Sequence, residues 1–321
     1  MIVSKVLPKK PSQANPVGST GHPAERPTGS PLVAGLLRTA RPRQWSKNVL
    51  VFAAPGAAGV ITHGGPLLRS LAAFVIFCVV ASGTYFLNDA LDAEADRHHP
   101  LKRHRPIAAG VVSVRVGLAV GSGLLAFGVG VAALVDWRLA MVMAIYVAVQ
   151  FAYSFYLKHQ PIYDLSAVAA GFVLRAIAGG VAARVPVSGW FLIVVTFGSL
   201  LMVTGKRLAE HAELGDTRGA HRATLDAYST TFLRTALAIS ASAAILGYCL
   251  WAFSLQTARL HHDTIWFQLS IVPIILGMLR YTFLVESGKG AKPEELVLED
   301  RSLQVLGLIW AVLFALGVYV A

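Results

Sequence analysis

The sequence TYFLNDALDAEADRHHP at residues 84–100 continues a long apolar run and becomes acidic within two helical turns. About 20 apolar residues in a helix cross the hydrocarbon core of a bilayer, and the run at 67–87 has that length. At 100° per residue, Asp92 and Asp96 lie within about 60° of Asp89. The stretch therefore predicts a membrane-spanning helix that ends in a patch of three carboxylates.

Similar apolar runs recur through the chain. They occupy residues 48–62, 113–135, 138–158, 162–183, 188–205, 232–255, 265–285 and 303–321. The first is short and carries Pro55, Gly56 and Gly59, which favour a tilted or broken helix. The chain has 55% hydrophobic and only 14% charged residues, a composition that excludes an ordinary soluble domain. We expect an all-α polytopic membrane protein with about nine spanning helices.

The basic residues predict how the chain is oriented. An arrangement with a cytoplasmic N-terminus puts 22 of the 28 Lys and Arg residues on the cytoplasmic side. Residues 1–30, rich in Pro and Ser, are expected to form a disordered cytoplasmic arm, and 31–321 one transmembrane domain. The net charge of +11 favours anionic lipids or phosphorylated ligands, whereas the high hydropathy argues against nucleic acid.

Two local patterns predict packing. Leu32, Val33, Leu36 and Leu37 recur at helical spacing before a basic stretch that contains Trp45. This pattern is typical of an amphipathic helix at the membrane interface. Further on, Gly117 and Gly121 are four residues apart, which lets another helix approach closely.

The carboxylates of Asp89, Asp92 and Asp96, beside Asn88, suggest a metal site. Converging carboxylates repel each other unless a cation joins them, and oxygen ligands suit Mg²⁺, which usually completes its shell with substrate phosphates. We therefore predict a Mg²⁺-bound diphosphate there. The alternative is that these are solvated charges at a helix end.

The sequence YSFYLKHQPIYDLSAVAAGFVLRAIAGG at 153–180 carries Tyr153, Lys158, Asp164 and Arg175. Asp164 and Arg175 are three turns apart, so they share a helical face at about 16 Å. A charge inside a span is costly and suggests a functional site. The structural alternative is that Arg175 pairs internally and braces neighbouring helices.

A second polar segment, GKRLAEHAELGDTRGAHRATLDAYS at 205–229, is strongly cationic. Lys206 and Glu210 share a helical face, as do Arg218 and Arg222. Ordinary surface ion pairs would explain them. Together with Arg207, however, these cations could bind a second phosphate through charge-assisted hydrogen bonds.

The sequence NDALDAEAD at 88–96 resembles the NDxxDxxxD signature of the UbiA prenyltransferase superfamily, and KRHRPIAAG at 102–110 resembles the basic loop that follows it. The resemblance implies a helical membrane enzyme whose central cavity opens to the cytoplasm and holds a diphosphate through Mg²⁺. Asp89, Asp92 and Asp96 would be the metal ligands, with Asp89 and Asp92 catalytic. The chain departs from the family where a second acidic motif is expected, because Lys206 and Arg207 stand there.

Together with RPRQWSKN at 41–48, these motifs most closely resemble the branch that transfers phosphoribose to decaprenyl phosphate for cell-wall arabinan synthesis. The resemblance implies phosphoribosyl diphosphate as donor, a polyprenyl (decaprenyl) phosphate as acceptor and a location in the cell membrane. The expected substrate-binding residues are Lys47, Asn88, Tyr153, Lys158, Asp164, Arg175, Lys206, Arg207, Glu210 and Arg222.

Two other functions stay open at this point. One is an aromatic prenyltransferase of quinone or haem synthesis, which a second acidic motif would favour. The other, more remote, is a membrane transporter or lipid-binding protein, although the two halves of the chain show no repeat. Self-association into a homo-oligomer is a further expectation.

Overall fold

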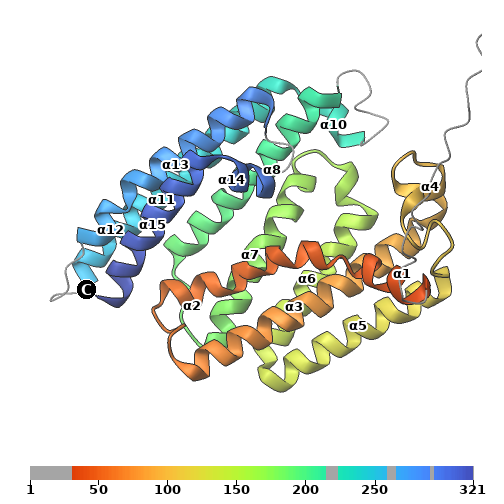
Figure 1. The fold of residues 1–321 in the computed structure, drawn as a ribbon. Coiled ribbons are helices and arrows are strands. Elements are labelled where there is room, and N and C mark those ends of the chain that lie inside the picture. Colours follow the sequence, from red (N-terminus) through yellow and green to blue (C-terminus); the bar gives the residue numbers. More distant parts are fainter. Residues whose placement is uncertain (1–30, 215–222, 259–264, 290–292, 321) are drawn as a thin grey trace, which may run out of the picture.

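The computed structural model describes residues 31–214, 223–258, 265–289 and 293–320, and these ranges contain helices and turns without a strand (Figure 1). The predicted all-α class is therefore confirmed for the described part of the chain. The arm expected at 1–30 lies outside the described residues.

Eight of the described helices are long and apolar enough to cross a membrane. They are Gly64–Leu91, Val114–Val135, Trp137–Phe155, Tyr163–Ala183, Gly189–Ala212, Thr230–Ser254, Ile265–Gly288 and Arg301–Tyr319. They correspond to α3 (Gly64–Leu91), α5 (Val114–Val135), α6 (Trp137–Phe155), α7 (Tyr163–Ala183), α8 (Gly189–Leu214), α11 (Thr230–Ala258), α12 (Ile265–Leu269) with α13 (Ile271–Leu284), and α15 (Arg301–Tyr319).

The expected first span, 48–62, is broken. Its residues form the end of a 3₁₀ helix, η1 (Pro42–Phe52), the short α2 (Ala53–Ala57) and a turn. In that turn Gly59 has φ +72°, and a Cβ there would lie 2.9 Å from Val318 of α15. A residue with a side chain would therefore be strained at this position and would also clash with α15.

The helices are arranged in two groups on either side of α7 and α8 (Figure 1). On one side α3, α5 and α6 pack successively against one another, and both α3 and α6 contact α7. On the other side α8 contacts α11, α11 contacts α13, and α13 contacts α15. Each group has its own buried core, around Phe77 and Tyr146 in the first and around Leu233 and Tyr281 in the second.

Small residues bring α3 and α5 into close contact. A Cβ added to Gly121 would lie 2.8 Å from the Leu87 side chain and 3.1 Å from the carbonyl oxygen of Gly83. A Cβ added to Gly117 would lie 3.4 Å from the Cβ of Ala90 in α3 and 2.7 Å from Ile107 in the loop before α5. The close approach predicted from the spacing of Gly117 and Gly121 is therefore confirmed.

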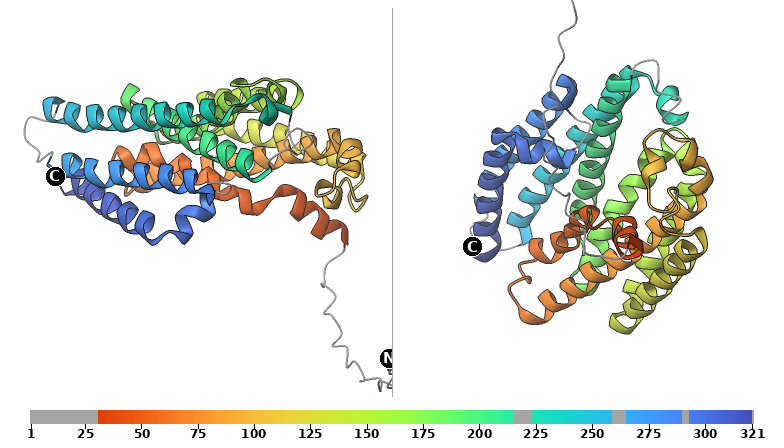
Figure 2. Two further views of the ribbon diagram at one scale, coloured as in Figure 1. Left: turned by 90° about the horizontal axis from the view of Figure 1, so that it is seen from above. Right: turned by 45° about the vertical axis from the view of Figure 1, so that its right-hand side comes forward.

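The amphipathic pattern before η1 forms the helix α1 (Pro31–Ala40). Gly35 and Thr39 are buried, and Gly35 lies against Val111 and Val112, which follow the acidic stretch. Leu32, Val33 and Leu37 remain exposed, which leaves an apolar face available to the membrane interface. The α1 helix and the short α4 (Ala93–His98) lie at the same end of the molecule (Figure 2).

Candidate active site

The acidic stretch after α3 does not continue as one uninterrupted helix. Helix α3 ends at Leu91, Asp92 has φ −87° and ψ 2°, and α4 begins at Ala93. Asp89 and Asp96 are buried and share one partner, whereas the Asp92 side chain is 43% exposed and faces Lys158. The three carboxylates therefore have different partners and exposure, although backbone hydrogen bonds from Asp92 N–H to Asn88 and from Asp96 N–H to the Asp92 carbonyl continue the helical path.

The two buried carboxylates are neutralised by arginines. Nη1 of Arg105 lies 3.0 Å from Oδ1 of Asp89 and 2.8 Å from Oδ2 of Asp96. Nη2 of Arg41 lies 2.6 Å from the same oxygen of Asp89, and its guanidinium lies 4.8 Å from the centroid of the Tyr85 ring. Ionised carboxylates away from water need such partners.

Arg41 and Arg105 are two site residues that the sequence analysis does not predict. Arg41 is forty-eight residues before Asp89, and Arg105 is sixteen residues after it. Helical periodicity cannot relate residues on separate elements. Both residues lie in basic segments that carry the family resemblance, at 41–48 and 102–110, but that signal does not indicate which carboxylate each arginine contacts.

The end of α6 and the 3₁₀ turn η3 (Leu157–His159) bring Ser154 and the predicted residue Lys158 to this end of α3. Oγ of Ser154 donates a hydrogen bond of 2.8 Å to Oδ1 of Asn88. Nζ of Lys158 lies 3.7 Å from Oδ1 of Asp92. Asn88, Asp92 and Lys158 are therefore brought together.

Asp164 is at the centre of a second polar cluster at the start of α7. It is fully buried and accepts hydrogen bonds from the Tyr228 hydroxyl, from Thr224 Oγ1 at 3.4 Å and from Arg207 Nε at 3.4 Å. Burial, and then the hydrogen bond to Asp164, raise the pKa of Tyr228 above its ordinary value, so the hydroxyl stays a donor.

This cluster also holds a strained backbone position. Ile162, directly before α7, has φ +71°, a conformation that costs a β-branched residue on the order of 1–3 kcal/mol. Its N–H donates a hydrogen bond of 2.6 Å to the Tyr228 hydroxyl oxygen. Tyr228 follows the short helix α10 (Ala223–Ala227), so the second polar segment is attached to the start of α7.

A polar cavity of about 450 Å³ adjoins this cluster. Its lining includes Lys47, Tyr153, Lys206, Arg207 and Glu210, all of them residues predicted for the site. Glu210 pairs with Arg207 Nη1 at 2.8 Å and lies 3.8 Å from Lys206 Nζ. The predicted shared face of Lys206 and Glu210 is confirmed.

Arg175, in α7, is not part of the lining of this cavity and faces the first helical group. It is 6% exposed, and its guanidinium donates hydrogen bonds to Asn48 Oδ1 at 2.7 Å, the Gly171 carbonyl at 2.6 Å and the Tyr146 hydroxyl at 3.3 Å. The Phe77 ring lies 5.1 Å away. These contacts join η1, α6 and α7, the arrangement expected of a brace. Arg222 lies outside the described residues.

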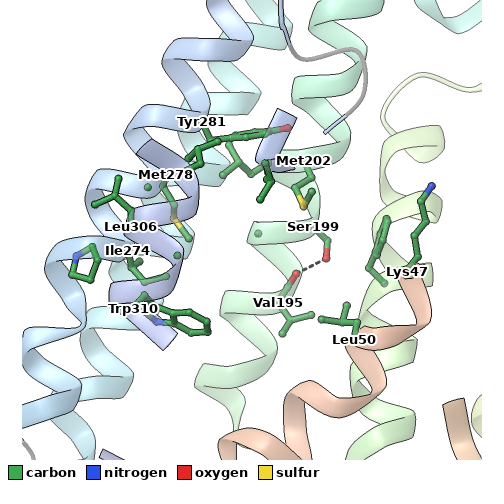
Figure 3. A pocket seen from close by; sticks show the side chains of 18 of the residues that line it. Lys47, Leu50, Val195, Ser199, Met202, Ile274, Met278, Tyr281, Leu306 and Trp310 are labelled. Carbon is green, nitrogen blue, oxygen red and sulfur yellow. Dashed lines mark hydrogen bonds between the residues drawn. The ribbon is translucent and has the colours of Figure 1, made fainter. Parts of the chain in front are cut away.

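The polar cavity shares four lining residues with a larger apolar cavity of about 540 Å³. Figure 3 shows the apolar cavity. Helix α8 contributes Val195, Ser199 and Met202, and the opposite wall comes from α13 and α15. A third cavity of about 330 Å³, lined by aromatic rings, shares Val195 and Trp310 with the apolar cavity. Shared lining residues therefore make the three cavities neighbours, the first with charged side chains in its lining and the other two lined mainly by apolar ones.

The donor set at the end of α3 fits Mg²⁺ in type, since Asp89, Asp92 and Asn88 offer only oxygen as ligand atoms. Among the described residues, no group of three acidic, His or Cys side chains converges as a ready metal site. Mg²⁺ is often held by one or two carboxylates, with waters and substrate phosphates as the other ligands. Asp89 and Asp92 could supply that number.

The chain belongs to the UbiA prenyltransferase family, whose pattern it matches over residues 49–306. With its eight apolar helices, it is a multi-pass membrane protein. It is 45% identical to decaprenyl-phosphate phosphoribosyltransferase of Mycolicibacterium smegmatis, over 92% of this chain and 96% of that protein. It is 43% identical to the protein of the same name from Corynebacterium glutamicum, over 90% and 88% of the two chains.

The fold is also that of solved structures. A UbiA homolog from Archaeoglobus fulgidus, solved with GPP and Mg²⁺ bound, superposes with a TM-score of 0.67. The superposition covers 89% of this chain and all of the other, at 19% identity. This likeness establishes the shared helical architecture.

Proposed function

We propose that the protein transfers a 5-phosphoribosyl group from phosphoribosyl diphosphate to a polyprenyl phosphate, with decaprenyl phosphate as the acceptor. The bond between the anomeric carbon and the diphosphate oxygen breaks, and a bond from that carbon to an oxygen of the lipid phosphate forms. The products are decaprenylphosphoryl-5-phosphoribose, a precursor for cell-wall arabinan, and diphosphate. Two relatives that are 45% and 43% identical to this chain are named decaprenyl-phosphate phosphoribosyltransferase, which supports this reaction.

One observation carries the proposal: a polar cavity with three cationic side chains adjoins an apolar cavity of about 540 Å³. A phosphorylated sugar needs the first kind of surface, and a polyprenyl chain needs the second. Lys206 and Arg207 occupy the segment where an aromatic prenyltransferase would carry a second acidic motif. This substitution of cations for carboxylates favours an additional phosphate over an aromatic acceptor.

On the donor side, Asp89 and Asp92 would hold Mg²⁺ against the diphosphate, assisted by Asn88 and Asp96. When bound there, Mg²⁺ would neutralise the negative charge that develops on the leaving diphosphate. Lys158, 3.7 Å from Asp92, is placed to contact the same phosphates. Tyr153, Asp164 and Glu210 would orient the donor or the cations that bind it.

On the acceptor side, the lipid phosphate is already anionic near neutral pH, so no strong general base is required. Catalysis then depends on holding a phosphate oxygen in line with the anomeric carbon. Attack from the face opposite the leaving diphosphate inverts that carbon. The reaction therefore needs positioned cations more than a proton acceptor.

We place the acidic end of α3 and the polar cavity on the cytoplasmic side of the cell membrane, together with the N-terminus. The excess of Lys and Arg on that side supports this orientation. Phosphoribosyl diphosphate is a soluble cytoplasmic compound, so the donor would reach the cavity directly. A homo-oligomeric state is compatible with this arrangement.

The decisive experiment follows radiolabel from phosphoribosyl diphosphate into polyprenyl phosphate, using purified protein in detergent with and without Mg²⁺. We expect metal-dependent labelled lipid, and a loss of at least about 100-fold in Asp89→Asn because the leaving group loses its neutralising site. Asp136→Asn is the matched control, since Asp136 caps α6 at the opposite end of the bundle. Folded protein that labels no lipid would redirect the search to prenyl diphosphates with aromatic acceptors.

A further inference from the structure

Lys47 lies where the polar and the apolar cavities meet. Four residues line both cavities, namely Ser46, Lys47, Phe172 and Met202, and Lys47 is the charged one among them. It is also the only charged residue among the described residues that line the apolar cavity. In Figure 3 its side chain extends away from Leu50, with the ammonium nitrogen at the edge of the lined space.

The other cations of the site hold different positions. Lys206 and Arg207 line the polar cavity but not the apolar one, and both pair with Glu210. Arg41 and Arg105 are bonded to the buried carboxylates of the acidic stretch. Lys47 therefore differs from Lys206 and Arg207 in lining the apolar cavity as well as the polar one.

A polyprenyl phosphate has one anionic group at one end of a long apolar chain. If the chain occupies the apolar cavity, its phosphate must lie at the mouth of that cavity, because burying an uncompensated anion among apolar side chains is costly. A lysine ammonium at that mouth provides a compact positive charge for the phosphate. The aromatic cavity beyond Trp310 extends the apolar path for the chain.

We propose that Lys47 binds the phosphate of the polyprenyl acceptor, whereas Lys206 and Arg207 serve the phosphoribosyl donor. This assignment rests on the proposed function, and it divides between two ligands the cations that the sequence leaves undivided. It makes η1 the element that selects for a phosphorylated lipid.

The test measures acceptor binding without the donor. Wild-type protein, Lys47→Ala and Lys206→Ala are titrated in detergent with decaprenyl phosphate and with decaprenol, the same chain without its phosphate. We expect Lys47→Ala to weaken decaprenyl phosphate binding about 10- to 100-fold, the loss of one charge-assisted contact, and to leave decaprenol binding unchanged. Unchanged decaprenol binding also shows that the variant is folded.

Lys206→Ala should bind decaprenyl phosphate as the wild type does, and instead raise the KM for phosphoribosyl diphosphate. Equal loss of lipid binding in both variants, or unchanged phosphate binding in Lys47→Ala, would overturn the assignment. The titration measures binding and needs no transfer reaction. A wrong assignment of Lys47 can therefore be distinguished from a wrong assignment of the phosphoribosyl reaction.

Discussion

Arg41 donates a hydrogen bond of 2.6 Å to Asp89, which is forty-eight residues further along the chain. Arg41 occupies the left-handed turn between α1 and η1, with φ +54°, and Asp89 is buried in the last turn of α3. The pair therefore attaches the turn after α1 to the acidic end of α3. The same turn leads along η1 to Lys47, so one segment connects the carboxylates with the cavities.

Replacing Arg41 tests this attachment. We expect Arg41→Ala to lower the free energy of unfolding by about 1–3 kcal/mol, since Asp89 would lose a partner while remaining buried. The measurement is thermal unfolding in detergent. Arg43→Ala is the matched control because its side chain is exposed, and comparable destabilisation by both variants would argue against a specific role for Arg41.

Arg175 should act as a brace. Arg175→Ala would leave the buried carbonyl oxygens of Asn48 and Gly171 without this donor, so we expect a loss of about 2–4 kcal/mol in unfolding free energy. In the folded fraction of this variant no contact to either substrate is lost, so we expect the KM values for donor and acceptor to change by less than about threefold. A large rise in either KM at unchanged stability would instead assign Arg175 to substrate binding.

Tyr228 should position Asp164 and, through it, Arg207. Tyr228→Phe removes the hydroxyl that donates to Asp164 and accepts from Ile162, and we expect the donor KM to rise about 5- to 30-fold, equivalent to about 1–2 kcal/mol. Tyr163→Phe, whose ring is exposed, is the control. An unchanged donor KM in Tyr228→Phe would show that the cluster around Asp164 does not contribute to donor binding.

The raised pKa of Tyr228 adds a pH dependence. The neutral hydroxyl is the favoured form in the folded protein, so its contribution to stability is complete below the ordinary tyrosine pKa of about 10 and is lost at higher pH. Unfolding profiles of wild type and Tyr228→Phe should therefore differ by a constant amount from pH 6 to 9. A difference that fell with rising pH within this window would contradict the assignment.

The contact between α3 and α5 can be tested with two neighbouring glycines. A Cβ at Gly121 would lie 2.8 Å from Leu87, whereas none of the surrounding atoms lies within 4 Å of a Cβ at Gly123. We expect Gly121→Ala to destabilise the protein by about 1–3 kcal/mol through overpacking. Gly123→Ala should be neutral or slightly stabilising. Equal unfolding midpoints of the two variants would show that a Cβ at Gly121 does not destabilise the contact between α3 and α5.

The sequence by itself determined the class of this protein. Apolar runs of bilayer length, the bias of basic residues and the NDALDAEAD motif are properties of contiguous residues, so they can be read without a structure. The close approach at Gly117 and Gly121 could be predicted for the same reason. Local spacing also located the break near Pro55.

Only the tertiary structure decided which charges meet. Arg41 with Asp89, and Arg207 with Asp164 forty-three residues earlier, come from separate elements. Asp92 pairs with Lys158, whereas Asp89 and Asp96 share Arg105, and both cations come from segments outside α3 and α4. Hydrogen-bonded partners must lie about 3 Å apart, whereas sequence spacing specifies only the face of one helix. The partners across helices are set by how those helices pack.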